Sequence, residues 1–523
     1  MRVAMTRWRR RSCRWPRSSR WWMSCSRCRR RCCPSSSTSA DATAKCGAGP
    51  RPCPASCPAS GVWGLKGAKM PTPIKLGVIG AGSATFSIGV IKDICLRESL
   101  AGSSVTLMDV DRTRLEPVHK FARRYADELG ADVSFEMTED REAALRDADF
   151  VINTAQFGGH AFVENLRAWE EQYGYYRGFC TGAWLNLRLM LSVARDMERL
   201  CPDAWLIQAG NPVFEGCTAM TRETGIKVCG ICHGHFGYRE VAEKIGLDPE
   251  RVTAEMVGFN HVIFLTRFEY DGRDAMPLLD EWIANKAEAF WSDYHPHFAD
   301  NQMSPAAVEI YKLVGMFPIG DTPRTGGWWF HTDLAAKKKW YGRDLGGFDS
   351  EIGWAQYLKG LEREVARIHA AVADESARLS DAFPPRPTGE QHFPLIDALV
   401  NDNRVELQVN VPNRGAIEGI PDDVVVELPA VCDAAGIHPR RIGKLPEVLM
   451  VTALWPRLLA AERLVHLATR SDGRYLMAMI LEDHRTRSWE QAVEFYHAIL
   501  ARPELAEAVA EMKQRGAAPE WRP

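Results

Sequence analysis

A short apolar segment, Lys75-Leu76-Gly77-Val78-Ile79-Gly80, runs into a glycine turn and then into a helical pattern that continues to Ile94. A buried strand that enters a helix through a tight glycine turn is the first unit of a parallel, doubly wound sheet. Further apolar segments alternate with helical patterns along the chain, at 104–108, 149–155 and 203–209. The sequence therefore predicts an α/β fold with a Rossmann-like, doubly wound parallel sheet.

The glycine turn also predicts a dinucleotide site. Gly80 permits the tight turn, and Gly82 lets the backbone approach a pyrophosphate held at the helix N-terminus. The third glycine of the usual pattern is replaced by Thr85. Asp109 ends the next strand, where a carboxylate accepts hydrogen bonds from a ribose diol and favours NAD over NADP, and a helix or turn cap is its alternative role. The candidate cofactor-binding residues are Gly80, Gly82, Ser83, Ala84, Thr85, Phe86, Asp109 and Asn153.

Polar residues follow or lie in three later apolar, strand-like segments. These residues are Asn211, Cys232, His233 and His261. Ligands on such sheets bind outside the carboxyl ends of the strands, so we expect these side chains at one cleft. A thiolate and an imidazole can hold a divalent ion and leave its coordination sphere open for substrate. From these residues alone, a buried thiol and a core histidine remain the alternative interpretation.

Charge divides the chain at about residue 70. Residues 1–69 hold 13 Arg and 3 Lys against the single acid Asp41, and eight of the 15 cysteines. This part predicts a disordered or spurious extension, with an organellar leader and an RNA-binding arm as alternatives. Residues 70–523 hold 49 basic and 66 acidic side chains, which argues against nucleic acid and anionic membrane as partners. Their seven cysteines fit a reducing cytosol, so a cytoplasmic location is expected.

From Lys75 to about Glu511 the chain resembles glycoside hydrolase family 4, the NAD- and metal-dependent glycosidases. Malate and lactate dehydrogenases share the Rossmann half of this pattern, but they lack the metal-binding pieces. The resemblance is carried by Gly80-Ala81-Gly82-Ser83 with Phe86, Asn211-Pro212, Cys232-His233, Gly258-Phe259-Asn260-His261, and the later segments 415–421 and 426–429.

The resemblance implies a redox-assisted elimination rather than the two-carboxylate mechanism of other glycosidases. In such enzymes NAD+ oxidises C3 of the sugar, a base removes the C2 proton, and the C1 substituent leaves. Water then adds, and the hydride returns to C3. A divalent ion, with Mn2+ expected, binds the sugar oxygens as a Lewis acid. Cys232 and His261 are the implied metal ligands.

The resemblance also assigns roles to residues around the sugar. Asp321 is the first candidate for the base, with Tyr311 second and a turn or helix cap as the alternative role of Asp321. His233 is expected to assist departure of the leaving group or to bind a sugar hydroxyl. Independently of the resemblance, the position of Asn211 after a strand predicts that its amide binds a substrate hydroxyl, with a turn Asn before Pro212 as the alternative.

Specificity is predicted from the residues after the metal cysteine. Cys232-His233-Gly234-His235 resembles the Cys-His-Gly-X subgroup, which is associated with α-galacturonidases. Arg177 stands where many relatives carry an Asp-Thr pair, and it is the candidate for a bidentate contact to a uronate carboxylate. An ion pair or a cofactor contact is the alternative for Arg177. The competing functions are α-glucuronidase, α-galactosidase, an NAD-dependent hydroxy-acid dehydrogenase, and an inactive NAD-binding protein.

The expected domain organisation has three parts. An extension covers residues 1–69, an NAD-binding Rossmann-like domain covers 70–265, and a mostly helical α+β domain covers 266–523. The last part is expected to bind substrate and to mediate oligomerisation. The partner is expected to be a small-molecule glycoside, and the assembly a homodimer or homotetramer.

Overall fold

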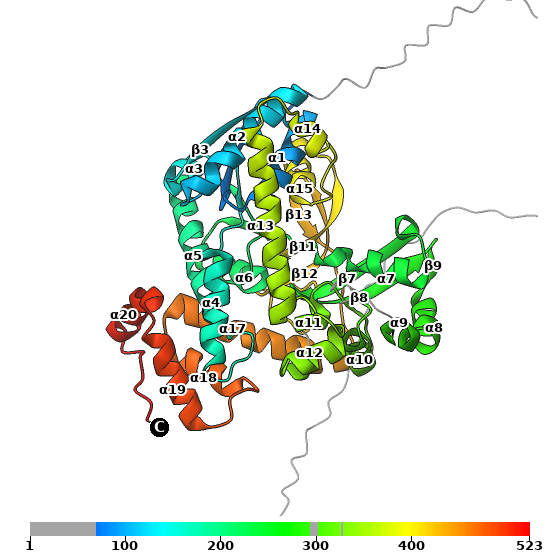
Figure 1. The fold of residues 1–523 in the computed structure, drawn as a ribbon, viewed down its shortest axis with the longest axis vertical. Helices are drawn as coiled ribbons and strands as arrows, with labels where there is room; N and C mark the ends of the chain where they lie inside the picture. The colour runs from blue at the N-terminus through cyan, green and yellow to red at the C-terminus, as the bar shows by residue number, and fades with distance from the viewer. Residues whose placement is uncertain (1–69, 293–301, 326–327, 523) are drawn as a thin grey trace, which may run out of the picture. The chain divides into compact units, whose positions relative to one another are not determined.

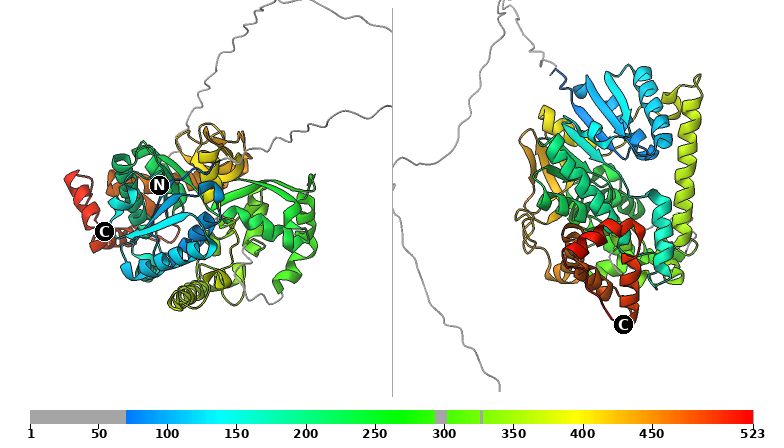
Figure 2. Two further views of the ribbon diagram at one scale, coloured as in Figure 1. Left: turned by 90° about the horizontal axis from the view of Figure 1, so that it is seen from above. Right: turned by 90° about the vertical axis from the view of Figure 1, so that its left-hand side faces the viewer.

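The structure, a computed structural model, describes residues 70–292, 302–325 and 328–522. The predicted extension 1–69 lies outside these described residues. The chain from Ala68 to Pro523 forms one compact unit. Its described part is a large sheet covered by helices, with the long helix α13 (Glu351–Ala373) running along it (Figures 1 and 2).

Six strands form the parallel half of the sheet, in the order β3-β2-β1-β4-β5-β6. The strand order reverses at β1, which pairs with β2 on one side and β4 on the other, and ligands bind at such a switch point. The predicted doubly wound parallel sheet is confirmed. The strands are β1 (Lys75–Ile79), β2 (Ser103–Met108), β3 (Val133–Thr138), β4 (Phe150–Asn153), β5 (Trp205–Gln208) and β6 (Lys227–Gly230).

Local signals in the sequence set the ends of the crossover helices. Asp111 caps the second helix through its carboxylate, which accepts from the Thr113 backbone, and Gly130 ends it in the left-handed region. The first two helices pack against each other, and so do the fifth and sixth. The helices are α1 (Ala84–Cys95), α2 (Arg112–Leu129), α3 (Arg141–Leu145), α4 (Gly159–Glu171), α5 (Thr181–Leu200) and α6 (Val213–Glu223).

The same sheet continues into the second half through antiparallel strands. Asn410 pairs with Gly230 and Glu427 with Gly258, so the strands of the second half extend the main sheet. A Cβ at Gly230 would lie 2.8 Å from the Cβ of Asn410, so the close approach requires glycine. The strands are β7 (Val252–Phe259), β8 (Val262–Tyr270), β9 (Arg273–Asp274), β10 (Pro318–Ile319), β11 (Val405–Pro412), β12 (Val425–Asp433) and β13 (Gly436–Pro439).

The predicted domain boundary at residues 265 and 266 lies inside β8, and the sheet continues across it. The division into two domains therefore stays a prediction. A smaller apolar cluster packs β7 and β8 against α8 (Met276–Asn285) and α10 (Pro305–Val314), apart from the main core.

The C-terminal part is helical, as predicted, and no described helix is long and apolar enough to cross a membrane. The helix that begins at Trp489 ends at Leu500, and the next α-helix begins only at Ala506, because Pro503 lies between them. The helices are α15 (His392–Asn401), α17 (Trp455–Arg470), α18 (Gly473–Glu482), α19 (Trp489–Leu500) and α20 (Ala506–Gln514).

Candidate active site

The glycine turn has the geometry that its sequence predicts. Gly80 lies at φ +87°, and a Cβ there would lie 2.7 Å from the backbone nitrogen of Ala155. The backbone nitrogen of Gly82 donates to Asp109 Oδ2 at 2.7 Å. Asp111, and not Asp109, caps α2. The Asp109 carboxylate therefore lies against the turn. Its Oδ1 also accepts from the Asp111 backbone nitrogen at 3.0 Å, which is the turn contact considered as its alternative role, so the ribose-binding role stays a prediction.

The other predicted cofactor-binding residues differ in exposure, and some already contact other residues of the protein. Ser83 precedes α1 and donates its backbone N–H to Gly80, Ala84 is buried, and Thr85 is exposed. The Phe86 ring packs edge-on against the His392 ring, with centroids 5.3 Å apart. Asn153 is buried at the end of β4. Its side chain donates to Gln208 Oε1 at 2.9 Å and accepts from the Ala155 backbone, so its role toward a cofactor stays a prediction.

The Cys232 loop follows β6 at the edge of the sheet where the glycine turn also lies. The backbone nitrogen of Gly234 donates to Cys232 Sγ at 3.4 Å. His235 is buried, and its Nδ1 lies 3.0 Å from the carbonyl oxygen of Cys232. His235 therefore stabilises the loop through its contact with the backbone, and this contact does not make it a metal ligand beside Cys232. A Cβ at Gly320 would lie 2.6 Å from the carbonyl oxygen of Gly234, so Gly320 lets the next chain segment approach this loop closely.

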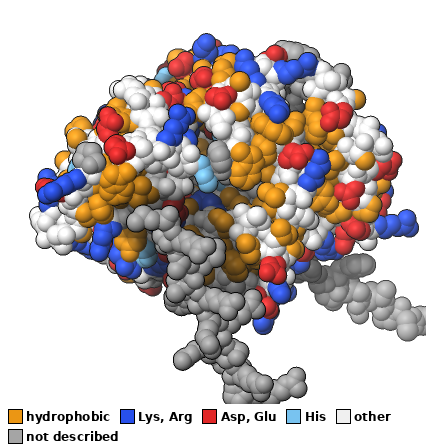
Figure 3. All heavy atoms as spheres, turned by 90° about the horizontal axis from the view of Figure 1, so that it is seen from below, with side chains coloured by type: hydrophobic (Ala, Val, Ile, Leu, Met, Phe, Trp, Pro, Cys, Tyr) orange, Lys and Arg blue, Asp and Glu red, His pale blue; other side chains and the backbone are white. Residues whose placement is uncertain are grey.

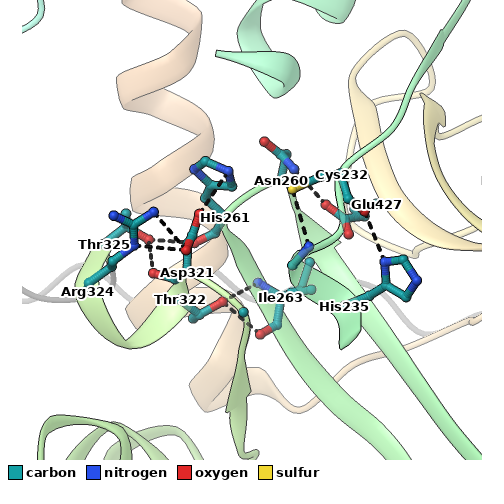
Figure 4. Close-up of polar contacts among 12 residues, drawn as sticks. Cys232, His235, Asn260, His261, Ile263, Asp321, Thr322, Arg324, Thr325 and Glu427 are labelled. Carbon is teal, nitrogen blue, oxygen red and sulfur yellow. Dashed lines mark hydrogen bonds and ion pairs between the residues drawn. The ribbon is translucent and has the colours of Figure 1, made fainter. Parts of the chain in front are cut away.

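That segment carries Asp321, which lies between β10 and α11 (Thr322–Thr325). Asp321 Oδ2 is 3.1 Å from His261 Nε2, and Oδ1 accepts from Arg324 Nε at 2.8 Å. Figure 4 shows the His261 ring and the Asp321 carboxylate facing each other, with Cys232 on the neighbouring loop. Because the carboxylate contacts two side chains, it is placed for more than the turn or cap role considered for it.

The turn at His261 is fixed from both sides. His261 itself lies at φ +64°, in the left-handed region, and its carbonyl accepts from the Thr325 hydroxyl. The Thr322 hydroxyl accepts from the Ile263 backbone nitrogen at 2.8 Å and donates to the Ile263 carbonyl at 2.9 Å. These contacts hold α11 and the start of β8 together, so the His261–Asp321 contact rests on rigid elements.

Electrostatics around Cys232 fit a divalent cation. Burial, with the nearby Glu427 and Asp321 charges, raises the pKa of the Cys232 thiol to about 12. Burial lowers the pKa of His261, which favours the neutral imidazole that metals bind. Burial alone would raise the pKa of Asp321, but His261 and Arg324 outweigh it and hold that pKa well below its usual value. A Cys232 thiolate would need a cation beside it, because burial and the nearby Glu427 and Asp321 oppose its negative charge, so the donor set fits the metal that the resemblance implies.

Within the described part of the chain, no group of three or more His, Cys, Asp or Glu side chains is arranged to cage a metal. Cys232 and His261 are joined through Asp321, which contacts the imidazole and electrostatically raises the thiol pKa. These two ligands would leave coordination positions for substrate oxygens.

Two glutamates at this site were not predicted. Glu427 on β12 is buried, and its Oε2 accepts from Asn260 Nδ2 at 3.0 Å, directly before His261 in the chain. Glu390 Oε1 lies 3.3 Å from Nδ1 of the exposed His233. The sequence contains one signal for Glu427, which is that this acid interrupts an otherwise apolar run at 424–428. Glu390 gave no signal, because it meets His233 only through folding.

Two further predicted residues are engaged by other side chains in the structure, so their roles toward the substrate stay predictions. The Arg177 guanidinium is bound by both Glu164 oxygens at 3.0 Å, and its Nε donates to the Asp349 carbonyl. A uronate would have to displace Glu164, so the ion-pair alternative describes Arg177. The Tyr311 hydroxyl donates to Asp280 Oδ1 at 2.9 Å on α8 and is not brought to Asp321.

Asn211 follows β5 and is exposed, as its predicted contact with a sugar hydroxyl requires. Figure 3 shows that one face of the molecule is hollowed near its centre, with basic and histidine side chains below a partly apolar rim. Substrate binding by Asn211 stays a prediction.

Comparison with known proteins decides the family. The model of the family 4 glycosyl hydrolases matches residues 75–247, and the model of their C-terminal domain matches residues 256–486. The chain belongs to family 4 of the glycosyl hydrolases. Family 4 membership makes the protein a glycosidase and confirms the predicted resemblance.

Individual family 4 relatives differ in substrate. The chain is 24% identical to an alpha-galactosidase of Bacillus subtilis (strain 168), over 78% of this chain and 93% of that protein. It is also 24% identical to an alpha-galacturonidase of Thermoanaerobacter italicus, over 78% and 91% of the two chains. The structure of a 6-phospho-alpha-glucosidase from gut microorganisms, in complex with NAD and Mn2+, superposes with a TM-score of 0.66 at 20% identity. The match covers 82% of this chain and 98% of that one, and it shows a shared fold.

Proposed function

We propose that this glycosidase is an α-galacturonidase that uses NAD+ and a divalent ion, with Mn2+ expected, to cleave short α-linked uronides. The observation that carries the proposal is Asp321, which contacts His261 and electrostatically affects Cys232 at the sheet edge that holds the glycine turn. The Cys232-His233-Gly234-His235 pattern and the relatives named as α-galacturonidases support the acidic sugar.

Separate groups of residues would hold the two cofactors. The turn from Gly80 to Ser83 and the N-terminus of α1 would bind the pyrophosphate, and Asp109 would accept from the ribose. Cys232 and His261 would bind the ion. When bound, NAD+ supplies reversible hydride transfer at a sugar carbon, and the ion supplies Lewis-acid polarisation of the sugar oxygens.

Asp321 is the base that the geometry favours. Its low pKa keeps the carboxylate ionised at neutral pH. Because Oδ1 accepts from Arg324, Oδ2, which lies 3.1 Å from His261 Nε2, is the oxygen that would take the C2 proton. Arg324 is itself held by Asp349 at 2.9 Å, which fixes the orientation of the Asp321 carboxylate.

His233 would protonate the departing oxygen. Its imidazole is exposed, and the hydrogen bond with Glu390 raises the pKa of His233. A raised pKa increases the protonated fraction near neutral pH, which is the form that donates a proton. Glu390 bonds Nδ1, so Nε2 is the nitrogen that faces the substrate.

One assay separates the competing functions. Aryl α-D-galacturonide is incubated with and without NAD+, Mn2+ and thiol, and both aglycone and NADH are measured. Aglycone release without NADH accumulation is expected, because the hydride returns to C3. Stoichiometric NADH would instead show the hydroxy-acid dehydrogenase. Aryl α-D-glucuronide and α-D-galactoside, run in parallel, test the two alternative glycosidase specificities.

The oligomeric state is part of the same proposal. We expect a homodimer or homotetramer, and light scattering of the purified full chain measures this directly. A monomer at all concentrations would contradict it.

A further inference from the structure

A pair of buried N–H donors without acceptors lies between α4 and the N-terminal turn of α13. The Arg167 guanidinium carbon lies 4.3 Å from the centre of the Trp354 ring. Arg167 Nη1 and Trp354 Nε1 are both buried, and neither has a hydrogen-bond partner among the described residues. Trp354 is only 7% exposed. Two adjacent donors of this kind require an acceptor, because a buried unpaired polar group is destabilising.

The acids near this pair are already bound by other arginines. Glu164 binds Arg177 through both oxygens, and its nearest oxygen lies 3.9 Å from Arg167 Nη1, beyond hydrogen-bond distance. Asp349 Oδ2 binds Arg324 at 2.9 Å. Burial lowers the pKa of Arg167, which is the electrostatic sign of a guanidinium without enough compensating charge.

Lys337 adds a further positive charge to this region. It is 2% exposed, and its Nζ contacts His331 Nδ1 at 3.0 Å. Within the described ranges it forms no salt bridge, although the charges of Asp349 and Arg167 both reach it. Burial lowers the pKa of Lys337 to about 8. The side chains Arg167, Trp354 and Lys337, which we call the anion cluster, thus combine two buried basic groups with two hydrogen-bond donors that lack partners among the described residues.

The anion cluster lies between the two halves of the active site. On the metal side, the Phe348 ring packs against Trp354 and also beneath Arg324, which binds Asp321. On the cofactor side, the His160 ring lies 6.0 Å from the Trp354 ring.

His160 in turn connects the cluster to the glycine turn. Burial and the charges of Arg114 and Arg167 lower the pKa of His160, so both arginines lie near it. Arg114 Nε donates to the Gly82 carbonyl at 3.0 Å. Contacts therefore connect the anion cluster to the glycine turn on one side and to Asp321 on the other.

We infer that Arg167 Nη1 and Trp354 Nε1 bind an anionic group on the substrate sugar, with Lys337 supplying additional positive charge. Under the proposed function, on which this inference rests, that group is the uronate carboxylate. Its two oxygens match one guanidinium donor and one indole donor. Arg177 is then a positioning residue, because it holds Glu164 away from Arg167. A phosphate on the sugar would offer the same acceptor chemistry, so the experiment includes it.

The test compares charged and neutral sugars in Arg167→Met, Trp354→Phe and Lys337→Met. Turnover is measured on aryl α-D-galacturonide and aryl α-D-galactoside, and calorimetry with NAD+ present measures binding of D-galacturonate, D-galactose and galactose 6-phosphate. Loss of a charged hydrogen bond predicts about a 10- to 100-fold lower kcat/KM on galacturonide for Arg167→Met, with the galactoside unchanged. Trp354→Phe keeps the ring and loses the N–H, so about a 3- to 10-fold loss is expected.

Arg502→Met is the matched control. Arg502 also stacks on a tryptophan, 4.6 Å from the Trp169 ring, but its guanidinium is bound by Glu504 at 2.7 Å. It should leave the preference for charged sugars unchanged.

Each outcome supports or overturns the inference. Equal losses on charged and neutral sugars in Arg167→Met would show a structural role and overturn it, as would no loss at all. Equal wild-type binding of D-galactose and both anionic sugars would also overturn it. A wild-type preference for galactose 6-phosphate that Arg167→Met abolishes would keep the anion cluster and reject the uronide function. If Arg167→Met does not fold, Trp354→Phe and Lys337→Met decide by the same comparison.

Discussion

Replacement of Glu427 by glutamine measures how much the buried charge of this residue lowers the free energy of unfolding. Glu427 lies on β12 opposite Asn410 and Gly258, and it is 1% exposed. Its Oε2 accepts from Asn260, but its Oε1 has no hydrogen-bond partner among the described residues. Glutamine has the same shape without the charge, so Glu427→Gln isolates the electrostatic part.

The magnitude follows from the pKa of Glu427. Burial, opposed by hydrogen bonds from Asn260 and others, raises this pKa from 4.5 to about 7. The folded protein therefore holds the proton more tightly than the unfolded chain does. The contribution of protonated Glu427 to the free energy of unfolding is fully present below pH 4.5. It falls as the pH rises and is lost above about pH 7. The complete loss corresponds to about 3 kcal/mol.

The assay is urea unfolding of the metal-free protein, in chelator, from pH 5 to pH 8. Wild type and Glu427→Gln should differ by less than about 1 kcal/mol at pH 5. At pH 8 the variant should be more stable by up to about 3 kcal/mol. Glu406→Gln, an exposed change on the neighbouring strand β11, is the control and should show no such pH-dependent gain. A difference that stays constant with pH, or that favours wild type at pH 8, would refute the reasoning.

Four further predictions concern the active site. Cys232→Ser should abolish Mn2+ binding in equilibrium dialysis but leave NAD+ binding intact. Gly82→Val places a Cβ 2.7 Å from Asp109 Oδ2, so fluorescence titration should show at least about tenfold weaker NAD+ binding. Asp321→Asn should lower kcat by about 10²- to 10⁴-fold in initial-rate assays, without weakening NAD+ binding. Because the pKa of His233 is raised, activity should fall as pH rises through that pKa, and His233→Gln should flatten this alkaline limb.

The parallel half of the fold could be predicted because its signals are local. Strand β1, the glycine turn and α1 are adjacent in the chain, and apolar runs mark each buried strand. The strands' carboxyl ends then place Asp109 and Cys232 at one edge without knowledge of any side-chain contact. The same reasoning does not extend to the second half, where β11 and β12 join the main sheet through Gly230 and Gly258.

The contacts that shape the site join distant residues, which is why the sequence did not reveal them. Glu427 accepts a hydrogen bond from Asn260, which is 167 positions away in the sequence. Glu390 contacts His233, which is also distant from it in the sequence. A lone acid in a chain predicts a solvated side chain, since acids are mostly exposed. Only the folded sheet shows that Glu427 is enclosed and that its charge acts on the Cys232 thiol.

The sequence also could not show which arginine, Arg177 or Arg167, has donors available for an anionic sugar. Sequence position favours Arg177, because it stands where many relatives carry an Asp-Thr pair. A guanidinium can bind a ligand only where its donors are free, and that depends on which carboxylates lie within reach. Glu164 lies on α4, one helical turn from Arg167, yet it binds Arg177 through both oxygens. Glu164 thus pairs closely with Arg177, which Glu171 also approaches at 3.7 Å, and leaves Arg167 with an unpaired buried donor. If Glu164→Gln releases the Arg177 guanidinium, both Arg167 and Arg177 should contribute to the preference for galacturonide over galactoside. Arg167→Met should then cost less activity in that background than in wild type.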